Sequence, residues 1–586
     1  MNEKIIFFFT CAFIHYKKKI KIFVSYINYL FEELLIFNFF SNYFFKTKKN
    51  IFKSKEFNDF IDKNSKFWQK KNKLNTNFDK NILVENFINQ PAYTMSNAVI
   101  ATYIKNIFNY NIVGLLRKGD YAGKAIFESY GIKDIYYYKN INIFQRLRVL
   151  FISLKLIKNY KKINNFCKIK YKNISVGLSS YDAYVRYTGK PSLKFINSEL
   201  VYFLSDSIAA SIFFDNFLDK RKIKFSVQAE TAFSPSNNLF QTCLKKKIKV
   251  FTRLGTNTFS IRIYKEWRER YTYRATFEKK IFEKIYSKRK KYCTKKYDLF
   301  HKKEIKDRKF GLDVAVQDNI IKTKAVTKTD IKKLFNWDNK KVAVIFLHHF
   351  IDGNFHCGPR KTFMDNYTWA KFTINALSKI KSVNWIIKPH PSQYVYKTRD
   401  NLQKEIEILI KNNKHIKVFP REFSQSSLLN ITDFAITSHG TAGVEYLAHG
   451  INTVYCDNSF YSNLKFIKMS EGSSNYLKTL KNLNKLKIPT NDMINKAKTF
   501  LYIRHHLVKC DCSLLSQHST TRKIDKKLFW TQNTVRLKKF SFDKDELYNM
   551  FKLQLKHNWE HSISFNKLNI KNKNFFQNKI KYGYKC

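Results

Sequence analysis

Cysteine is scarce in this sequence of 586 residues, and the few cysteines are scattered. A disulfide framework needs closely spaced cysteines in a short secreted chain, so this pattern argues against one. The spacing favours a protein of the reducing cytoplasm. The nine positions are Cys11, Cys167, Cys243, Cys293, Cys357, Cys456, Cys510, Cys512 and Cys586.

Long hydrophobic runs are absent as well. No apolar stretch reaches the roughly 20 residues that a membrane-spanning helix needs. The short apolar run at residues 5–14 is followed by lysines and not by a small-residue cleavage site, so we expect no secretory signal. Residues 20–40, IKIFVSYINYLFEELLIFNFF, indicate an amphipathic, aromatic-rich helical region. Two placements of this region stay open: on a membrane surface, or packed against the body of the protein.

Acidic residues are few. The chain has 45 Asp and Glu against 108 Lys and Arg, which gives a formal net charge of +63. Nucleic-acid binding predicts a basic face or helix, but here lysines alternate with Asn, Ile, Phe and Tyr along the whole chain, as a codon bias toward A and T produces. We therefore expect no specific nucleic-acid partner. A positive field still favours anionic lipid head groups, sugar nucleotides and acidic polysaccharide.

The chain is long and apolar enough for several folded domains. A hydrophobic fraction of 44% and an aromatic fraction of 17% suffice for packed cores. Changes in composition and in the strand and helix pattern along the chain predict four segments. They are a helical leader rich in aromatics and lysine (1–75), an N-terminal acceptor domain with a helical excursion (76–330), a C-terminal nucleotide-donor domain (331–500) and a helical polar tail (501–586).

Strand and helix patterns alternate in both central segments. In the first, buried strands are predicted at residues 82–87, 111–116 and 134–138, with a helix over 96–108 capped by Ser96. In the second, strands are predicted at 341–349, 383–390, 416–420, 434–440 and 451–457, with helices between them. Alternation at this spacing is typical of parallel α/β sheets. We therefore predict two Rossmann-like, doubly wound domains facing a cleft.

Polar residues of the second domain cluster where strands end. The clusters lie at 346–356, 388–393 and 437–443. Ligands of open parallel sheets bind outside the carboxyl ends of the strands, so we expect the three clusters to meet in one crevice. Two prolines also hold His390 in a narrow range of directions.

The last cluster suits a phosphate. Hydroxyls and small residues before a helix leave backbone N–H groups and a positive dipole end free for an anion. Lys388 and His390 would flank the same anion, and Glu445, one turn into the helix, is a candidate partner for a ribose hydroxyl. The other residues predicted to bind the donor phosphate or nucleotide are Pro391, Ser438, His439, Gly440, Thr441 and Gly443.

The segments KPHP (388–391) and ITDFAITSHGTAGVEYLAHGINTVYCD (431–457) resemble the HP and Ser motifs of bacterial capsule polysaccharide biosynthesis proteins. That family includes Kdo transferases of the GT-B fold and, more remotely, polysialyltransferases and glycerophosphotransferases. The resemblance covers roughly residues 80–500 and is strongest over 340–460. It implies that His390, Pro391 and Ser438 bind the nucleotide phosphate. The sequence departs from the family in having Asp352-Gly353 without a second acid before it.

The resemblance implies a glycosyltransferase that uses a nucleotide-activated sugar, such as a CMP-linked sugar, without a metal or other cofactor. Hydrogen-bond donors that contact the departing phosphate stabilise the transition state. A base is also needed to take the proton of the acceptor hydroxyl. The candidate bases are Asp352, His349 and Glu230. The candidate acceptor residues are Tyr181, Asp182 and Arg186. We expect a cytoplasmic enzyme of capsule or surface glycan synthesis, peripheral on the inner membrane face, with a glycan or lipid-linked acceptor.

Other functions stay open at this stage. A CDP-glycerol-type polyol-phosphate transferase would use the same phosphate site, and a sugar-nucleotide epimerase shares the fold. A basic nucleic-acid-binding protein and a non-catalytic assembly factor that has lost its base are the alternatives from other classes.

Overall fold

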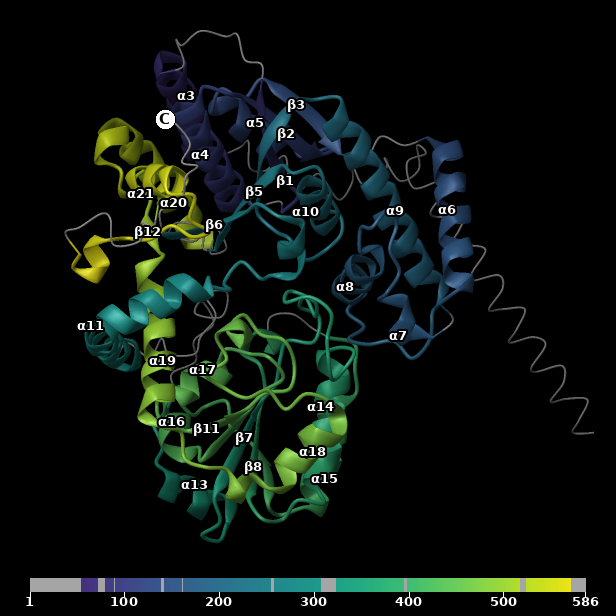
Figure 1. Cartoon of the computed structure of the whole chain (residues 1–586), viewed down its shortest axis with the longest axis vertical. Coiled ribbons are helices and arrows are strands. Elements are labelled where there is room, and N and C mark those ends of the chain that lie inside the picture. Colours follow the sequence, from purple (N-terminus) through teal and green to yellow (C-terminus); the bar gives the residue numbers. More distant parts are fainter. Residues whose placement is uncertain are drawn as a thin grey trace, which may run out of the picture.

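The structure is a computed structural model, and it describes residues 54–71, 80–88, 90–138, 142–160, 162–254, 258–306, 323–394, 398–516 and 523–570. Two sheets, one above the other, form the two halves of the described molecule (Figure 1). The amphipathic region predicted at residues 20–40 lies outside the described residues.

The N-terminal half is built on a sheet of seven strands. Its centre is parallel, in the order β3-β2-β1-β4-β5, and β6 and β12 extend it as antiparallel strands. The strands predicted at 82–87, 111–116 and 134–138 are confirmed. The apolar runs of the first two are buried, whereas the third lies at the edge of the sheet and is largely exposed. The strands are β1 (Asn81–Asn86), β2 (Asn111–Arg117), β3 (Asp134–Tyr138), β4 (Ile223–Gln228), β5 (Lys249–Leu254), β6 (Thr258–Tyr264) and β12 (Cys510–Asp511).

Helices cover this sheet, and one of them begins earlier than predicted. Helix α4 starts at Pro91, which suits a first helical position, so Ser96 lies inside the helix and its hydroxyl bonds the carbonyl of Ala92. The helices of this half are α3 (Lys55–Lys71), α4 (Pro91–Phe108), α5 (Tyr121–Ser129), α6 (Ile143–Lys158), α7 (Ile163–Phe166), α8 (Val176–Thr188), α9 (Ser198–Asp219) and α10 (Ser236–Lys245).

The C-terminal half is a five-stranded parallel sheet in the order β11-β10-β7-β8-β9. All five predicted strands are present: β7 (Val342–Phe346), β8 (Asn384–Lys388), β9 (Ile416–Val418), β10 (Phe434–Ile436) and β11 (Asn452–Val454). Its helices include α13 (Lys328–Phe335), α14 (Asn366–Leu377), α15 (Leu402–Asn412), α16 (Leu428–Ile431), α17 (Ala442–Leu447) and α18 (Ser473–Lys481). The prediction of two doubly wound α/β halves is thus confirmed, and in each half the strand order reverses beside the first strand.

The end of the described chain returns to the first half. Helix α19 (Asn491–Tyr502) packs on α11 (Lys279–Lys306), and the chain then runs to β12 at the edge of the N-terminal sheet (Figure 1). Helices α20 (Lys523–Lys539) and α21 (Glu546–Lys556) follow, and Trp530 and Phe551 are buried with Val84 in one core cluster. The sequence predicts a helical polar tail over 501–586; in the described part of that segment, the buried side chains of α20 and α21 belong to the core of the N-terminal half.

No helix in the described part of the chain is both long and apolar enough to cross a bilayer.

Candidate functional site

Four imidazoles gather at the carboxyl edge of the C-terminal sheet. His348 and His349 follow β7, His390 follows β8 and His439 follows β10. The rings of His348 and His439 are stacked with centroids 4.4 Å apart, and those of His349 and His390 are 6.0 Å apart. Because β7 lies between β8 and β10, the three predicted polar clusters are brought together at the point where the strand order reverses.

The stacked pair is neutral. Burial, and then the nearby charge of Arg360 for His348 and the proximity of His348 for His439, hold the pKa of both rings well below the usual range. His348 Nε2 accepts the backbone N–H of His439 at 3.3 Å and lies 3.1 Å from Thr437 Oγ1. The unprotonated Nε2 therefore fixes the start of the 437–443 turn, a structural role for His348.

Lys388 brings a cation to the same edge. Desolvation lowers its pKa to about 8, and its Nζ has a long contact, 3.3 Å, to the Pro389 carbonyl. His390 turns its Nδ1 inward, where it accepts the N–H of Ser392 at 3.2 Å. An anion beside Lys388 would offset the cost of desolvating the ammonium group. The surroundings of Lys388 are therefore compatible with the phosphate that the sequence predicts.

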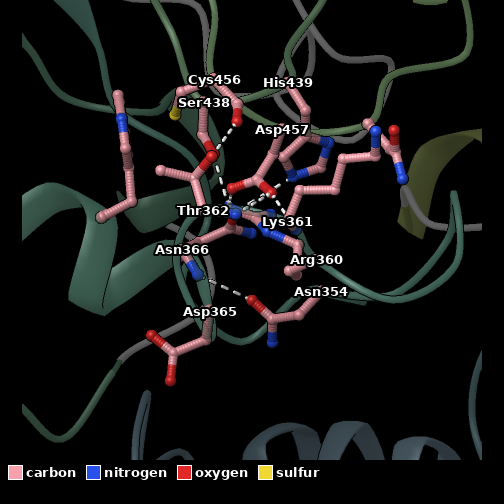
Figure 2. Close-up of polar contacts among 12 residues, drawn as sticks. Asn354, Arg360, Lys361, Thr362, Asp365, Asn366, Ser438, His439, Cys456 and Asp457 are labelled. Atoms are coloured by element: carbon pink, nitrogen blue, oxygen red, sulfur yellow. Dashed lines mark hydrogen bonds and ion pairs between the residues drawn. The ribbon is translucent and has the colours of Figure 1, made fainter. Parts of the chain in front are cut away.

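Ser438 is more enclosed than the sequence predicts. Its side chain is fully buried, and its Oγ accepts a hydrogen bond from Arg360 Nη2 at 2.5 Å. The same guanidinium donates to Asn366 Oδ1 at 2.9 Å and forms an ion pair with Asp457 at 2.9 Å (Figure 2). The Ser438 hydroxyl thus contacts Arg360 and is not exposed, and its predicted role in binding phosphate stays a prediction.

Asp457 organises the loop that carries Arg360. One carboxylate oxygen accepts the backbone N–H groups of Lys361 at 2.7 Å and Thr362 at 3.0 Å, while the other faces Arg360. His439 Nε2 lies 3.0 Å from Asn366 Oδ1, so the same amide links this loop to the histidine pair. Figure 2 shows the loop residues and the 438–439 turn pointing toward one another.

The two glycines of the turn serve packing. A Cβ on Gly440 would lie 2.8 Å from Thr437 Oγ1, and one on Gly443 would lie 2.2 Å from Tyr461 Oη. Both α-carbons thus face protein atoms. Thr441 is partly buried and precedes α17, and Glu445 is partly buried within that helix. The roles predicted for Gly440, Thr441, Gly443 and Glu445 stay predictions.

The three candidate bases differ in their surroundings. The side chain of Asp352 is 59% exposed and lies 3.8 Å from His356 Nε2. Glu230 is 14% exposed, pairs with Arg274 at 3.4 Å and accepts the N–H groups of Thr231 and Ala232. Burial raises the pKa of Glu230, but Arg274 and His356 outweigh it and hold the pKa below its usual value. His349 is buried, so Asp352 is the candidate most open to an acceptor.

His356 joins the two acids across the halves. Burial lowers the pKa of its ring, but the hydrogen bond and charge of Asp352, followed by the charges of Glu230 and Asp182, outweigh it and raise the pKa. Its ring also contacts Tyr273, with centroids 5.1 Å apart.

Two of the predicted acceptor residues tie the halves together. The Tyr181 hydroxyl donates to Asp365 at 2.6 Å, and Asp182 accepts the backbone N–H of Asn354 at 2.8 Å. Both side chains are buried, and the acceptor roles predicted for Tyr181 and Asp182 stay predictions. Arg186 is partly buried and lies over the ring of Phe233 at 5.9 Å.

A cavity of about 570 Å³ opens between the halves beside the Arg360 loop. One wall is the loop 359–364 and the other belongs to the N-terminal half. Its cations are Lys168, Lys170, Arg270, Arg360 and Lys361. This composition suits an anionic sugar or phosphate. In the described residues, no group of three or more His, Cys, Asp or Glu is arranged to hold a metal ion.

Sequence reasoning missed Arg360, Asn366, Asp457 and His356. His356 is the last residue of the first polar cluster, and Arg360 lies four residues beyond it, in the run HCGPR. Asp457 lies three residues past the end of β11. The rule that ligands bind beyond the carboxyl ends of parallel strands is therefore the signal that could have identified it.

No protein-family model matches the chain, and no curated protein matches it. Among solved structures, the β-Kdo 2,4-transferase domain of KpsC from Thermosulfurimonas dismutans aligns with 47% of this chain and 79% of its own, at 11% identity and a TM-score of 0.30. The β-Kdo 2,7-transferase of the same protein aligns with 52% and 83%, at 13% identity and 0.27. A UDP-GlcNAc 2-epimerase from Neisseria meningitidis bound to UDP-GlcNAc aligns with 72% and 99%, at 11% identity and 0.22.

Proposed function

We propose that this protein is a glycosyltransferase that takes its sugar from a nucleotide-activated donor and acts in capsule or other surface-glycan synthesis. The observation that carries the proposal is the gathering of Lys388, His390 and the 437–443 turn at one edge of the C-terminal sheet, beside β7. The two halves join at a cation-lined cavity, which supports a reaction between two bound substrates.

In the proposed reaction the bond between the anomeric carbon and the donor phosphate breaks, and an acceptor hydroxyl takes the anomeric carbon. Negative charge grows on the departing phosphate, so the Lys388 ammonium and the His390 imidazole stabilise the transition state more than the bound donor. Arg360 is a further candidate, because the residue lines the cavity and its guanidinium donates to Ser438.

The acceptor hydroxyl must lose a proton, and Asp352 is the candidate base that the geometry favours. Its carboxylate is exposed, and His356 lies 3.8 Å from it. Desolvation raises the pKa of Asp352, but His356, the Gly353 N–H and Arg186 outweigh it and hold the pKa below its usual value, so the carboxylate is ionised and able to accept a proton. The protonated acid then returns its proton to solvent.

Direct assay of donor turnover tests the proposal. Purified protein is incubated with CMP-, UDP- and CDP-linked donors, with and without glycan acceptors, and nucleotide release is measured. We expect one donor class to be turned over and His390→Ala to lower kcat by about 10²–10³-fold. The matched control is His415→Ala, since His415 precedes β9 at the opposite edge of the same sheet.

Each outcome assigns a function. Turnover of CDP-glycerol alone would assign a polyol-phosphate transferase to the same site, and UDP-sugar epimerisation without transfer would assign an epimerase. Turnover that His390→Ala and His415→Ala affect equally would contradict the proposed phosphate site. Retention of activity in a chelator is expected, because the proposed reaction is metal-independent.

A further inference from the structure

Helix α6 exposes an apolar stripe on the side away from the core. Phe144 is 77% exposed, Phe151 is 70% exposed, and Leu147 and Leu154 lie between and beside them at helical spacing. The opposite side packs on α9, where Val149, Leu150 and Ser153 are buried and the Ser205 hydroxyl donates to Ser153. The stripe therefore does not belong to the core that holds α6 in place.

Basic side chains flank the stripe. Arg148, Lys155 and Lys158 are all exposed on the same outward side of α6, one helical turn from the phenylalanines. Helix α6 contains no acidic residue. Figure 1 shows α6 at the outer side of the N-terminal half, with α9 between it and the sheet.

A cavity of about 860 Å³ adjoins this helix. Arg148 belongs both to the exposed side of α6 and to the wall of the cavity. Arg221, which also lines the cavity, lies over the rings of Tyr136 at 3.9 Å and Phe217 at 4.0 Å, and its Nε has no hydrogen-bond partner among the described residues. The cations lining the cavity are Lys118, Arg148, Lys172, Lys220 and Arg221, and no acidic residue is among its described lining residues.

We propose that α6 and the cationic cavity beside it dock the protein on an anionic phospholipid bilayer. The apolar stripe would enter the boundary between head groups and acyl chains, and the flanking cations would meet lipid phosphates. Charge decides the occupant. All charged residues of α6 are cations, and this matches an anionic lipid surface, while a second copy of this chain would bring the same positive charges against it.

This docking surface differs from the proposed reaction site. The 570 Å³ cavity between the halves has no residue of α6 in its wall. Membrane docking is therefore independent of the proposed transferase activity, and either can fail without the other.

Vesicle co-sedimentation of the full chain tests the proposal. Vesicles of phosphatidylcholine with phosphatidylglycerol are compared with vesicles of phosphatidylcholine alone, at physiological ionic strength. We expect binding to the anionic vesicles, and we expect Phe144→Ser/Phe151→Ser and Arg148→Glu/Lys155→Glu each to weaken it by about tenfold or more. These side chains are exposed, so the fold should be unaffected.

Helix α15 supplies the matched controls. Ile408 is 62% exposed there, and Lys404 and Lys411 are exposed on the same helix. Ile408→Ser and Lys404→Glu/Lys411→Glu remove similar groups elsewhere and should leave vesicle binding unchanged. Equal losses from the α6 and α15 charge variants would overturn the proposal in favour of general electrostatic attraction.

Two other results would also overturn it. Binding that survives both α6 variants would place the membrane contact elsewhere in the chain. A change of oligomeric mass in Phe144→Ser/Phe151→Ser, measured by light scattering, would show that the stripe is covered by a second copy. Donor turnover with a soluble acceptor, measured in parallel, should not change in the α6 variants.

Discussion

Lys388 carries a charge whose desolvation no neighbouring charge offsets. Its pKa is about 8 in the folded chain against 10.5 for an ordinary lysine, and desolvation is the cause. Between these two values the unfolded chain binds the extra proton, so the free energy of unfolding should rise with pH from about 8 to about 10.5. Strongly shifted pKa values are concentrated at functional sites, so the destabilising charge of Lys388 fits a role in binding an anionic ligand.

Replacing this lysine by Met tests that cost. We expect Lys388→Met to raise the free energy of unfolding at pH 7 by about 1–3 kcal/mol and to flatten its rise above pH 8. Urea denaturation at pH 7 and pH 10 measures both effects. Nucleotide binding should weaken in the same variant, and in the wild type it should weaken as the pH passes about 8. A variant no more stable than wild type at pH 7 would contradict the argument.

Asp182 gives the opposite pH dependence. Burial raises the pKa of its carboxyl to about 7, although hydrogen bonds from Asn354 and Phe355 and the charge of His356 partly offset this. The folded state then binds more protons than the unfolded state between about pH 4 and 7, so this group's contribution to stability is lost as pH rises through 7. Asp182→Asn should remove that decline, by about 1–3 kcal/mol between pH 5 and 8. Denaturation curves at pH 5 and pH 8 measure this. An equal fall in the free energy of unfolding in wild type and Asp182→Asn would contradict the role of Asp182.

At the scale of elements, the sequence predicted strands better than it predicted the site. Strands such as residues 342–346 are buried on both faces of a parallel sheet. They therefore appear in the sequence as continuous apolar runs, which can be recognised without knowledge of distant residues. Arg360 and Asp457 were missed because their pairing joins a loop to a strand end 97 positions away, which no local pattern records. For the same reason the burial of α20 and α21 could not be predicted.

The turn before α17 depends on close packing that a single methyl group would disturb. An added Cβ on Gly443 would lie 2.2 Å from the Tyr461 hydroxyl, which itself donates to the Gly440 carbonyl at 3.1 Å. We expect Gly443→Ala to lower the free energy of unfolding by about 1–3 kcal/mol. Tyr461→Phe removes the clashing oxygen, so the double variant should be less destabilised than the sum of the two single variants. Thermal or chemical denaturation of the four proteins closes the cycle, and strict additivity would contradict the packing argument.

At the scale of the molecule, the two halves are held together by more than one connection. Tyr181 and Asp182 of α8 bond Asp365 and Asn354 of the C-terminal half, and the chain returns through α19 to β12. The loop with Arg360 therefore lies between a fixed contact with α8 and the strand end at Asp457. This arrangement couples the geometry of the cavity to the relative position of the halves.

The return of the chain makes the N-terminal core depend on residues far along the sequence. Phe551 of α21 is fully buried, and its ring lies 5.5 Å from that of Phe251 on β5. Phe551→Ala should lower the stability of the N-terminal half by about 3–5 kcal/mol, because it leaves a cavity in that core. Hydrogen exchange followed by mass spectrometry should show faster exchange in β1, β4 and β5, with β7 and β8 unchanged. The control is Leu528→Ala on α20, since Leu528 is 44% exposed. Faster exchange limited to α20 and α21 would mean that these helices lie on the core without stabilising it, and the segment would then be the polar tail that its composition suggests.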